Sequence, residues 1–360
     1  MDQKTPFYSF HKSNEAKLVS FAGYHMPIQY KNGVNFEHNH VRNQVGVFDV
    51  SHMGQIIISG NYANQFIQKI TCNNVDKLFP GKVQYSCMLN AKGGIIDDLL
   101  IYCLSYQSYM LVVNAANHKK DLKWILDHNE YNCEVFDNTK SHGLLAIQGP
   151  LSNDYLQSFT DISLNKIPYY SFEIGKIADC ENVIISNTGY TGATGFELYV
   201  HRNDAAKIWK KLFSTNYNVE PIGLAARDTL RLEMGYCLYG NDIDEDTSPI
   251  EAGLGWITKF SKNFINSKNL KRQKLVGTKK KLVGIELLER GIPRKGYEIV
   301  NDKNVVIGNI TSGTMSPSLS KGIGMGYIDS DKSMINSKVG IKIRNKVIAA
   351  KIVKTPFVII

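Results

Sequence analysis

Three β-prone segments follow one another between residues 83 and 114, and they most strongly limit what the chain can fold into. The segments VQYSCML, IIDDLLIYCL and YMLVVNA are separated by the sequences NAKGG and SYQS. Glycine, asparagine and serine between β-prone runs are typical of tight connections between antiparallel strands. The pattern therefore predicts a β-meander in this part of the chain.

The middle segment carries two adjacent acids, Asp97 and Asp98, in an otherwise apolar run. Successive side chains of a strand point to opposite faces, so the two carboxylates cannot both leave the protein in the same direction. An ionised carboxylate is costly to bury without partners. The residues alone leave two interpretations open: a strand end with both acids in solvent, or one acid that serves a function inside the protein.

The rest of the chain mixes helical and strand patterns. Residues 34–46, 116–128 and 223–235 predict helices, as do NYANQFIQKIT and DAAKIWKKLF. The sequences VFDVSHMGQIIISG and ENVIISNTGYTGATGFELYVHRN each predict two strands joined by a loop, and HGLLAIQGP predicts one more strand. A lysine-rich polar stretch at 258–282 indicates a linker. Six short β-prone segments follow it and predict a compact all-β C-terminal domain, either a barrel or a sandwich, so the fold class is α+β.

Composition narrows the class of protein. The chain of 360 residues is 43% hydrophobic and 21% charged, which is typical of globular domains. No apolar stretch is long enough to span a bilayer, and the N-terminus lacks the pattern of a signal peptide, so we expect a cytoplasmic protein.

The six cysteines are scattered without a CxxC pair, which predicts reduced, buried thiols. The net charge of +9 is diffuse and favours an anionic ligand or an acidic partner over nucleic acid.

Several motifs are absent. The chain has no GxxxxGK[ST] loop, no GxGxxG between a strand and a helix, and no GxSxG elbow. Nucleotide cofactors and serine hydrolase chemistry are therefore disfavoured. His38 and His40 are two residues apart but have no third ligand at a suitable spacing, so we expect no metal site.

Four segments hold more polar character than a core needs: FDVSHM, GGIIDDLLIY, NTGYTGATGFELYV and GLAARDTLRLEMG. Taken singly, each also fits a structural role, because isolated polar residues mostly lie on the surface. His52 could cap a turn, and Glu197 could face water because it alternates with apolar neighbours. Arg227 and Arg231 could pair with surface acids.

Taken together and in order, these segments resemble the aminomethyltransferase (T-protein) family of the glycine cleavage system. The likeness extends over nearly the whole chain and includes TPFYSFH, SFAGYHMPIQY, LLAIQGP, GIPRKGYE, ITSGTMSPSL and KTPF. The resemblance implies a three-domain cloverleaf folate-binding fold of class α+β with a C-terminal β-barrel domain. It implies a folate-binding region at 1–275, with an inserted subdomain at about 50–140, and the barrel at 276–360.

The resemblance also implies the reaction. The methylene of an aminomethyl group carried on the lipoylated H-protein is transferred to tetrahydrofolate, giving 5,10-methylenetetrahydrofolate, ammonia and dihydrolipoyl H-protein. Nothing in the sequence indicates stable oligomerisation, so we expect a monomer, and we expect it to bind neither nucleic acid nor a membrane. An acidic H-protein and the anionic tail of a polyglutamylated folate would both be attracted to a surface with a net charge of +9.

Matched onto this sequence, Asp97 corresponds to the family's catalytic aspartate. Glu197 corresponds to the acid that binds the pterin, and Arg227 to an arginine of the folate site. Five further positions match residues that line the pocket: Met53, Tyr85, Val112, Asn114 and Trp256.

The chemistry of these residue types agrees with the implied roles. A carboxylate can accept a bidentate pair from the ring N–H and amine of a pterin, which suits Glu197. Aromatic and sulfur-bearing side chains suit the flat ring faces. Asp97 could orient the folate arylamine N10, accept its proton and stabilise positive charge on the transferred carbon. Whether Arg227 would fix Asp97 or a folate carbonyl stays open.

The sequence also departs from the family pattern. Ala193 replaces an acid in the glycine loop GYTGATG, and the chain ends in the apolar sequence PFVII, where some relatives carry an aromatic or basic residue. Three alternatives remain: a folate-dependent demethylase of a small methylated substrate, a non-catalytic folate-binding protein of the same fold, and, more remotely, a nucleic-acid-binding module.

Overall fold

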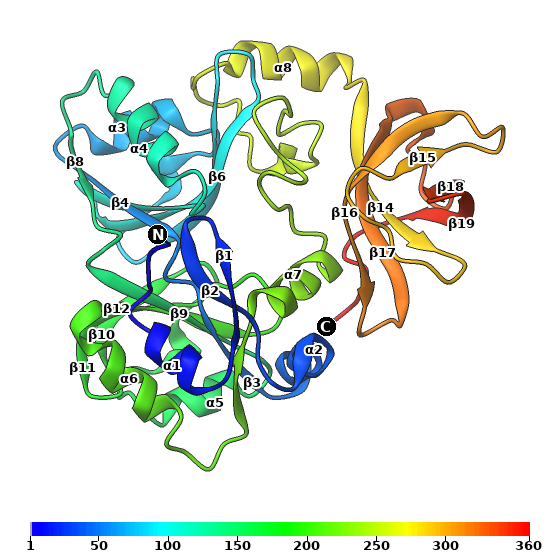
Figure 1. The fold of residues 1–360 in the computed structure, drawn as a ribbon. Coiled ribbons are helices and arrows are strands. Elements are labelled where there is room, and N and C mark those ends of the chain that lie inside the picture. The colour runs from blue at the N-terminus through cyan, green and yellow to red at the C-terminus, as the bar shows by residue number, and fades with distance from the viewer. Residues whose placement is uncertain (1) are drawn as a thin grey trace. The chain divides into compact units, whose positions relative to one another are not determined.

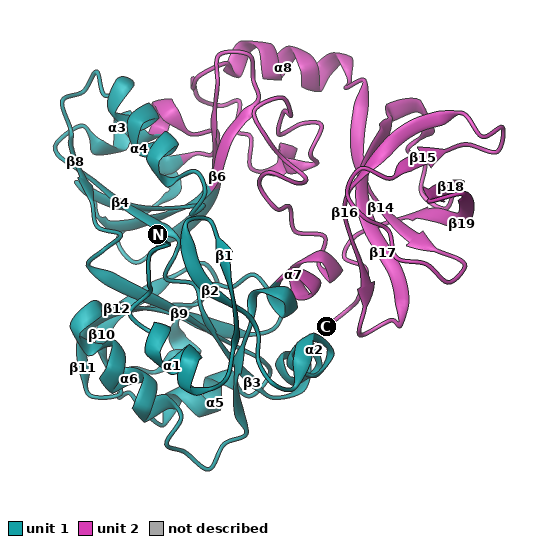
Figure 2. Ribbon diagram, viewed as in Figure 1, with its two compact units in different colours: residues 1–67, 75–85, 99–227 teal, residues 68–74, 86–98, 228–360 magenta. Residues whose placement is uncertain are grey.

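The computed structural model describes residues 2–360, and the chain divides into two compact units (Figure 2). Unit 1 comprises the residues up to 67 together with 75–85 and 99–227. Unit 2 comprises 68–74, 86–98 and 228–360. The predicted domain limits at 275 and 276 stay a prediction.

Helices and strands alternate along the chain, which confirms the α+β class (Figure 1). The helices are α1 Tyr8–Ser13, α2 Gly33–Asn43, α3 Ala63–Ile70, α4 His118–Asp127, α5 Ser152–Gln157, α6 Ala205–Leu212, α7 Leu224–Glu233 and α8 Ser267–Val276. The strands before α7 are β1 Lys17–Phe21, β2 Tyr24–Gln29, β3 Val45–Asp49, β4 Gly54–Ser59, β5 Val83–Leu89, β6 Ile95–Ser105, β7 Ser108–Val113, β8 Glu134–Asp137, β9 His142–Gln148, β10 Phe172–Ile177, β11 Cys180–Ser186, β12 Gly195–His201 and β13 Val219–Ile222.

Unit 1 contains a six-stranded sheet with the order β10-β11-β12-β9-β3-β13. Its strands pair antiparallel except for β13, which runs parallel to β3. The helices α1, α5 and α6 cover one face of this sheet (Figure 1). Their apolar side chains, such as Tyr155 and Trp209, join Leu145 and Leu198 of the sheet in one buried core. The sheet is therefore fixed from one side and holds the loops at its strand ends in place.

The predicted meander is confirmed as β5, β6 and β7, which are neighbours in a five-stranded sheet of order β5-β6-β7-β4-β8. The helices α3 and α4 lie over this sheet (Figure 1). The division into two units passes through β5 after Tyr85, through β6 after Asp98 and through α7 after Arg227. Tyr85 and Arg227 therefore fall in unit 1, and Asp97 falls in unit 2.

The C-terminal part of unit 2 is a closed barrel with the strand order β14-β17-β16-β15-β18-β19 (Figure 1). All six predicted strands are present, as β14 Lys280–Leu287, β15 Glu298–Val300, β16 Val306–Ser316, β17 Lys321–Asp329, β18 Lys338–Ile343 and β19 Lys346–Val353. Alternate residues of β14, namely Val283, Ile285 and Leu287, belong to the barrel core. This period of two is that of strands with one face in a core, and the expected C-terminal β-barrel is confirmed.

The stretch at 258–282 is not a simple linker, because α8 occupies its middle. Leu270 is the apolar residue that this helix buries, and Ser267 is buried with it. Gly277 ends the helix with a φ of +95°, a conformation that glycine adopts without strain. One buried leucine among many lysines is too weak an apolar signal to predict a helix from sequence.

Two expectations about the environment of the chain can be compared with the structure. The six cysteines are all free and buried, as predicted. None of the helices within residues 2–360 combines the length and the apolar character that a membrane crossing requires.

Candidate active site

A buried polar cluster in unit 1 is built around Glu197, on β12. This side chain is only 6% exposed, so the interpretation that it faces water is wrong. The hydroxyl of Thr188, in the glycine-rich loop between β11 and β12, donates to its Oε2 at 2.5 Å. Phe196 and Leu198 on either side are also buried, so β12 is covered on both faces.

Burial controls the ionisation of this cluster. Desolvation raises the pKa of the Glu197 carboxyl, while the Thr188 hydroxyl and the charge of Arg227 act in the opposite direction. Desolvation also lowers the pKa of Arg227, and the charge of Glu197 opposes that change. The two charged groups therefore support each other in a medium that penalises both. A ligand that donates hydrogen bonds to Glu197 would stabilise its ionised form further.

Arg227, near the start of α7, has an unfilled donor. Its guanidinium lies over the ring of Tyr190, 4.8 Å from the ring centroid, which is a cation–π arrangement. Its Nη1 is buried and has no hydrogen-bond partner among residues 2–360. Leaving a buried donor unsatisfied costs roughly 1–3 kcal/mol. This arrangement fits a site that binds a ligand with an acceptor atom, such as a carbonyl.

Hydroxyl groups from three strands and one loop meet beside Glu197. The hydroxyl of Tyr199 donates to that of Tyr102 at 2.9 Å, and the Tyr102 oxygen lies 3.1 Å from Ser186 Oγ and 3.3 Å from Thr188 Oγ1. Burial, together with the charge of Glu197, raises the pKa of Tyr102, so its phenol stays protonated. The network holds Thr188 in the position from which it binds Glu197.

Sequence analysis did not identify these supporting residues. Thr188 and Tyr190 lie within the quoted loop NTGYTG, so their place next to the acid-bearing strand was a usable signal. Tyr102 and Tyr199 are aromatic residues in apolar runs, a pattern that equally predicts core residues. Only the tertiary structure shows that their hydroxyls meet.

Four predicted pocket residues belong to unit 1. Val112 is buried on β7, and its side chain shares a sheet face with that of Tyr102, because Tyr102 pairs with Met110, two residues before Val112. Met53 follows the turn after β3, Tyr85 lies on β5, and Asn114 follows β7; all three are partly exposed. Val112 thus lies on the same face of the sheet as Tyr102.

His52, next to Met53, is a further buried polar residue. Burial lowers its pKa to about 4; the charge of Asp49 opposes this effect and that of Arg227 adds to it. Its ring meets Phe21 edge-on, and its Nδ1 has no hydrogen-bond partner within the described residues. At neutral pH His52 is therefore an uncharged imidazole that lies close enough to Arg227 to sense its charge.

Asp97 and Asp98 lie at the start of β6, within unit 2, and have different surroundings. Asp97 is fully buried, so the interpretation with both acids in solvent is wrong. Asp98 is partly exposed. The hydrogen bond with Cys72 and burial raise the pKa of the Cys87 thiol, burial raises that of Cys237, and the charge of Asp98 adds a smaller effect in the same direction to both. The two carboxylates are therefore not equivalent.

The strand that carries these acids is fastened at its beginning. The Ile95 N–H donates to the carbonyl oxygens of Asp244 and Thr247, at 2.9 and 3.0 Å. A Cβ added to Gly94 would lie 1.6 Å from the Glu245 carbonyl oxygen, so only glycine permits this close approach. The sequence Gly93-Gly94 before the acids thus positions Asp97 and Asp98 within unit 2.

Two further sequence features have clear places. Trp256, in a short 3₁₀ turn at Leu254–Trp256 of unit 2, is 63% exposed and does not pack into the core of that unit.

In the glycine loop of unit 1, the Ala193 N–H donates to Thr191 Oγ1, and the Thr191 hydroxyl donates to Gln148 Oε1 at 2.8 Å. The loop is therefore closed by hydrogen bonds although Ala193 replaces an acid.

The acids and arginine at the end of α7 form structural networks in unit 2. Arg231 is buried and donates to Asp228 and Asp242, so the expected pairing involves a buried acid as well as a surface one. Glu233 accepts hydrogen bonds from the hydroxyls of Ser316 and Ser318 in the barrel domain. These side chains fasten the helix and are not available to a ligand.

The family models decide the relationship of the chain to known proteins. The GCVT N-terminal domain matches residues 7–262, and the glycine cleavage T-protein C-terminal barrel domain matches 280–358. The chain belongs to the glycine cleavage T-protein family. It is therefore an enzyme with aminomethyltransferase function, as the resemblance implied.

Individual relatives are similar to this chain over nearly their whole length. The chain is 54% identical to an aminomethyltransferase of Flavobacterium psychrophilum over 357 residues, covering 99% of each chain. It is 53% identical to an aminomethyltransferase of Bacteroides thetaiotaomicron, covering 98% of this chain and 99% of the relative. The crystal structure of glycine cleavage system aminomethyltransferase T from Bartonella henselae matches with a TM-score of 0.93 at 33% identity, covering 99% of this chain and 98% of that one.

Proposed function

We propose that the chain binds tetrahydrofolate at the Glu197–Arg227 cluster of unit 1 and transfers to it the methylene of an aminomethyl group carried by the lipoylated H-protein. The products are 5,10-methylenetetrahydrofolate, ammonia and dihydrolipoyl H-protein. The observation that supports this proposal most is the buried cluster itself, in which a carboxylate and an arginine Nη1 donor lie in a site with spare hydrogen-bonding capacity.

Each side chain of the cluster has a role in this proposal. Glu197 accepts from the adjacent N–H groups of the pterin, which selects that edge by two parallel hydrogen bonds. Thr188 holds the carboxylate in place and leaves its second oxygen for the ligand. The Nη1 of Arg227 donates to a ligand carbonyl, and Val112 provides apolar contact for the ring system. Met53, Tyr85, Asn114 and Trp256 remain proposed pocket residues.

Asp97 is the proposed catalytic carboxylate. The folate supplies the arylamine nitrogen that accepts the one-carbon unit. A carboxylate can orient this amine, accept its proton as the new bond forms and stabilise positive charge on the carbon. Full burial supports this role, because a carboxylate in a medium of low dielectric interacts strongly with a developing charge.

The partner in this proposal is the lipoylated H-protein, encountered in the cytoplasm. Attraction between its acidic surface and the +9 charge of this chain would speed their association at low ionic strength. Ala193 does not argue against activity, since the loop that contains it is closed through Thr191.

The decisive experiment measures ammonia release from aminomethylated H-protein, with and without tetrahydrofolate. Wild type should release ammonia much faster with folate. Asp97→Asn should retain folate binding and lose turnover by about 10²–10⁴-fold, the range for removal of a general acid or base. Asp98→Asn is the matched control, because it removes the same charge one residue away, and it should retain most of the activity.

The outcomes separate the alternatives. Folate binding without release of ammonia from the H-protein would overturn the proposal, and methyl transfer from a small free substrate would then identify a folate-dependent demethylase. Equal losses in Asp97→Asn and Asp98→Asn would overturn the assignment of Asp97 while leaving the aminomethyltransferase activity in place.

A further inference from the structure

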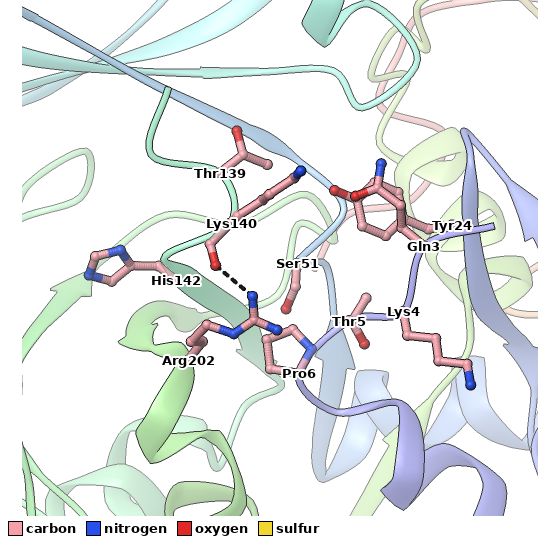
Figure 3. Close-up of a pocket in the computed structure, with 10 residues that line it drawn as sticks. All are labelled: Gln3, Lys4, Thr5, Pro6, Tyr24, Ser51, Thr139, Lys140, His142 and Arg202. Carbon is pink, nitrogen blue, oxygen red and sulfur yellow. Dashed lines mark hydrogen bonds between the residues drawn. The ribbon is translucent and has the colours of Figure 1, made fainter. Parts of the chain in front are cut away.

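Unit 1 contains a polar pocket of about 270 Å³ that neither Glu197 nor Arg227 lines (Figure 3). Its wall is formed by the segment before α1, the start of β2, the turn after β3, the loop between β8 and β9, and the residue after β12. The residues that matter for its chemistry are Gln3, Tyr24, Ser51, Thr139, Lys140 and Arg202. None of the proposed folate-site residues lines this pocket.

Two cationic groups in this pocket have donors to spare. The guanidinium of Arg202 donates from Nη1 to the Lys140 carbonyl oxygen at 3.0 Å, and both residues are exposed at the pocket rim. Its remaining N–H groups have no hydrogen-bond or ion-pair partner among residues 2–360, and the same holds for the amino group of Lys140. In Figure 3 that amino group points across the pocket toward Gln3 and Tyr24.

Further neutral donors complete the wall. The amide of Gln3 and the hydroxyl of Tyr24 also have no hydrogen-bond partner within the described part of the chain. Burial raises the pKa of Tyr24, with the charge of Asp137 as a second cause, so its hydroxyl is a donor at neutral pH. The pocket thus presents two cations and two neutral donor groups to the same space.

The other basic residues of the wall do not add charge to this space. The amino group of Lys4 lies over the ring of Tyr8, 4.6 Å from the centroid. The ring of His142 points away from the pocket in Figure 3 and meets His201 edge-on. Desolvation and the charge of His201 lower the pKa of His142, which keeps it neutral. The positive charge of the pocket therefore comes from Lys140 and Arg202.

No carboxylate lines the pocket, but those of Asp49 and Asp137 bond to its wall. Asp49 is buried, accepts from the Thr5 hydroxyl at 2.5 Å and lies 2.8 Å from His11 Nε2. Asp137 Oδ1 accepts from the Thr139 backbone N–H at 3.0 Å and lies 3.1 Å from His118 Nε2. The Thr139 hydroxyl in turn accepts the N–H of Gln55 at 2.9 Å, which fixes the loop between β8 and β9. The cations of the pocket thus have no acidic partner within it, and part of the wall is rigid.

We propose that this pocket is a binding site for a small oxyanion with two negative charges. Two cations with free N–H groups match the charge, and a guanidinium offers paired donors to two oxygens of such a group. The anion could be free phosphate or the neighbouring carboxylates of a glutamate chain, which share this chemistry. The pocket shares no lining residue with the proposed folate site, so an absence of anion binding here would leave the folate-dependent ammonia release in place.

The test is calorimetric titration of the full chain at low chloride, first with inorganic phosphate and then with a γ-linked glutamate oligomer. The test variant is Lys140→Gln/Arg202→Gln. The control is Lys210→Gln/Arg290→Gln, which removes two exposed cations elsewhere in the chain. We expect saturable binding of at least one probe, at least tenfold weaker in the test variant and unchanged in the control.

The two probes identify the source of the anion. Binding of phosphate alone assigns the site to free phosphate, and tighter binding of the glutamate oligomer assigns it to a carboxylate chain. The inference is overturned if neither probe saturates. It is also overturned if the control variant loses as much affinity as the test variant, because general surface charge would then explain the binding. Circular dichroism of both variants shows whether they are folded.

Discussion

Arg227 and Arg231 lie one turn apart on α7; Arg231 is buried, Arg227 is partly exposed with a buried Nη1, and their hydrogen bonds differ. Arg231 donates to the carboxylates of Asp228 and Asp242, to the Tyr236 carbonyl oxygen and to the Ser312 hydroxyl. Arg227 lies over the Tyr190 ring and keeps an unpartnered Nη1 among the described residues. The hydrogen-bond donors of Arg231 are therefore used within unit 2, whereas Arg227 keeps one unused buried donor.

The difference separates a structural role from a binding role. A buried charge that is fully hydrogen-bonded specifies the packing around it, and its removal leaves its partners unpaired. A buried donor without a partner lowers stability, and its presence is explained when a ligand completes it. The same residue type on one helix can therefore stabilise the fold at one position and bind a ligand at the next turn.

The largest expected effect is on folding. Arg231→Met leaves the carboxylate of Asp242 buried without its cation, and we expect a loss of about 3–5 kcal/mol in the free energy of unfolding. Arg227→Met removes the ring contact, an unpaired donor and the positive charge that favours ionised Glu197, but Glu197 can take up a proton, so we expect a smaller loss than for Arg231→Met. Urea denaturation of both variants measures the two values. Equal destabilisation would show that Arg227 is structural as well.

The next effect concerns acid stability and the uncharged His52. The pKa of this imidazole is about 4 in the folded chain and 6.5 in an exposed histidine, so the unfolded chain binds more protons between these values. Its contribution to stability is therefore complete above pH 6.5 and is lost as the pH falls toward 4. The expected loss is about 3 kcal/mol.

Urea denaturation of wild type and His52→Gln at several pH values between 4 and 7 measures this effect. The difference between the two proteins should change across that range, because the glutamine does not titrate. If the free energies of unfolding of wild type and His52→Gln change with pH in the same way, burial does not lower the pKa of His52, and the prediction is wrong.

The smallest effect concerns the hydroxyl that positions Glu197. Thr188→Val keeps the shape of the side chain and removes the hydrogen bond to Oε2. We expect roughly tenfold weaker tetrahydrofolate binding, since a hydrogen bond to a charged group contributes about 1.5–3 kcal/mol. The acid limb of the binding profile should move to higher pH, because the hydroxyl lowers the pKa of the carboxyl. A binding profile identical to that of wild type would show that Thr188 does not support the carboxylate.

Sequence analysis predicted most elements of this fold because their patterns are local. The strands around Asp97 and the strands of the barrel alternate apolar residues between turn residues, and the helix at 223–235 has a regular apolar spacing and a glycine just beyond its end. The helix α8 was missed because it buries little more than Leu270. Whether one leucine is buried depends on the tertiary structure, and a local sequence pattern carries no information about it.

The candidate site was predicted less completely, for a physical reason. Glu197 and Arg227 could be singled out as charged residues in apolar surroundings, and the resemblance assigned their roles. Nothing in the sequence distinguishes Arg227 from Arg231, because their difference depends on which side chains meet them. Likewise, the role of Tyr102 depends on its contact with Tyr199, which is almost a hundred positions away along the chain.

The most direct measurement is a calorimetric titration of tetrahydrofolate into wild type, Arg227→Met and Glu197→Gln, with the folding of each checked by circular dichroism. If the cluster binds the folate, both variants should stay folded and should bind it about tenfold to a hundredfold more weakly, the range for loss of a charge-assisted hydrogen bond. Folded variants that bind tetrahydrofolate as tightly as wild type would contradict the account, because the cluster would then be part of the scaffold and the folate would bind elsewhere.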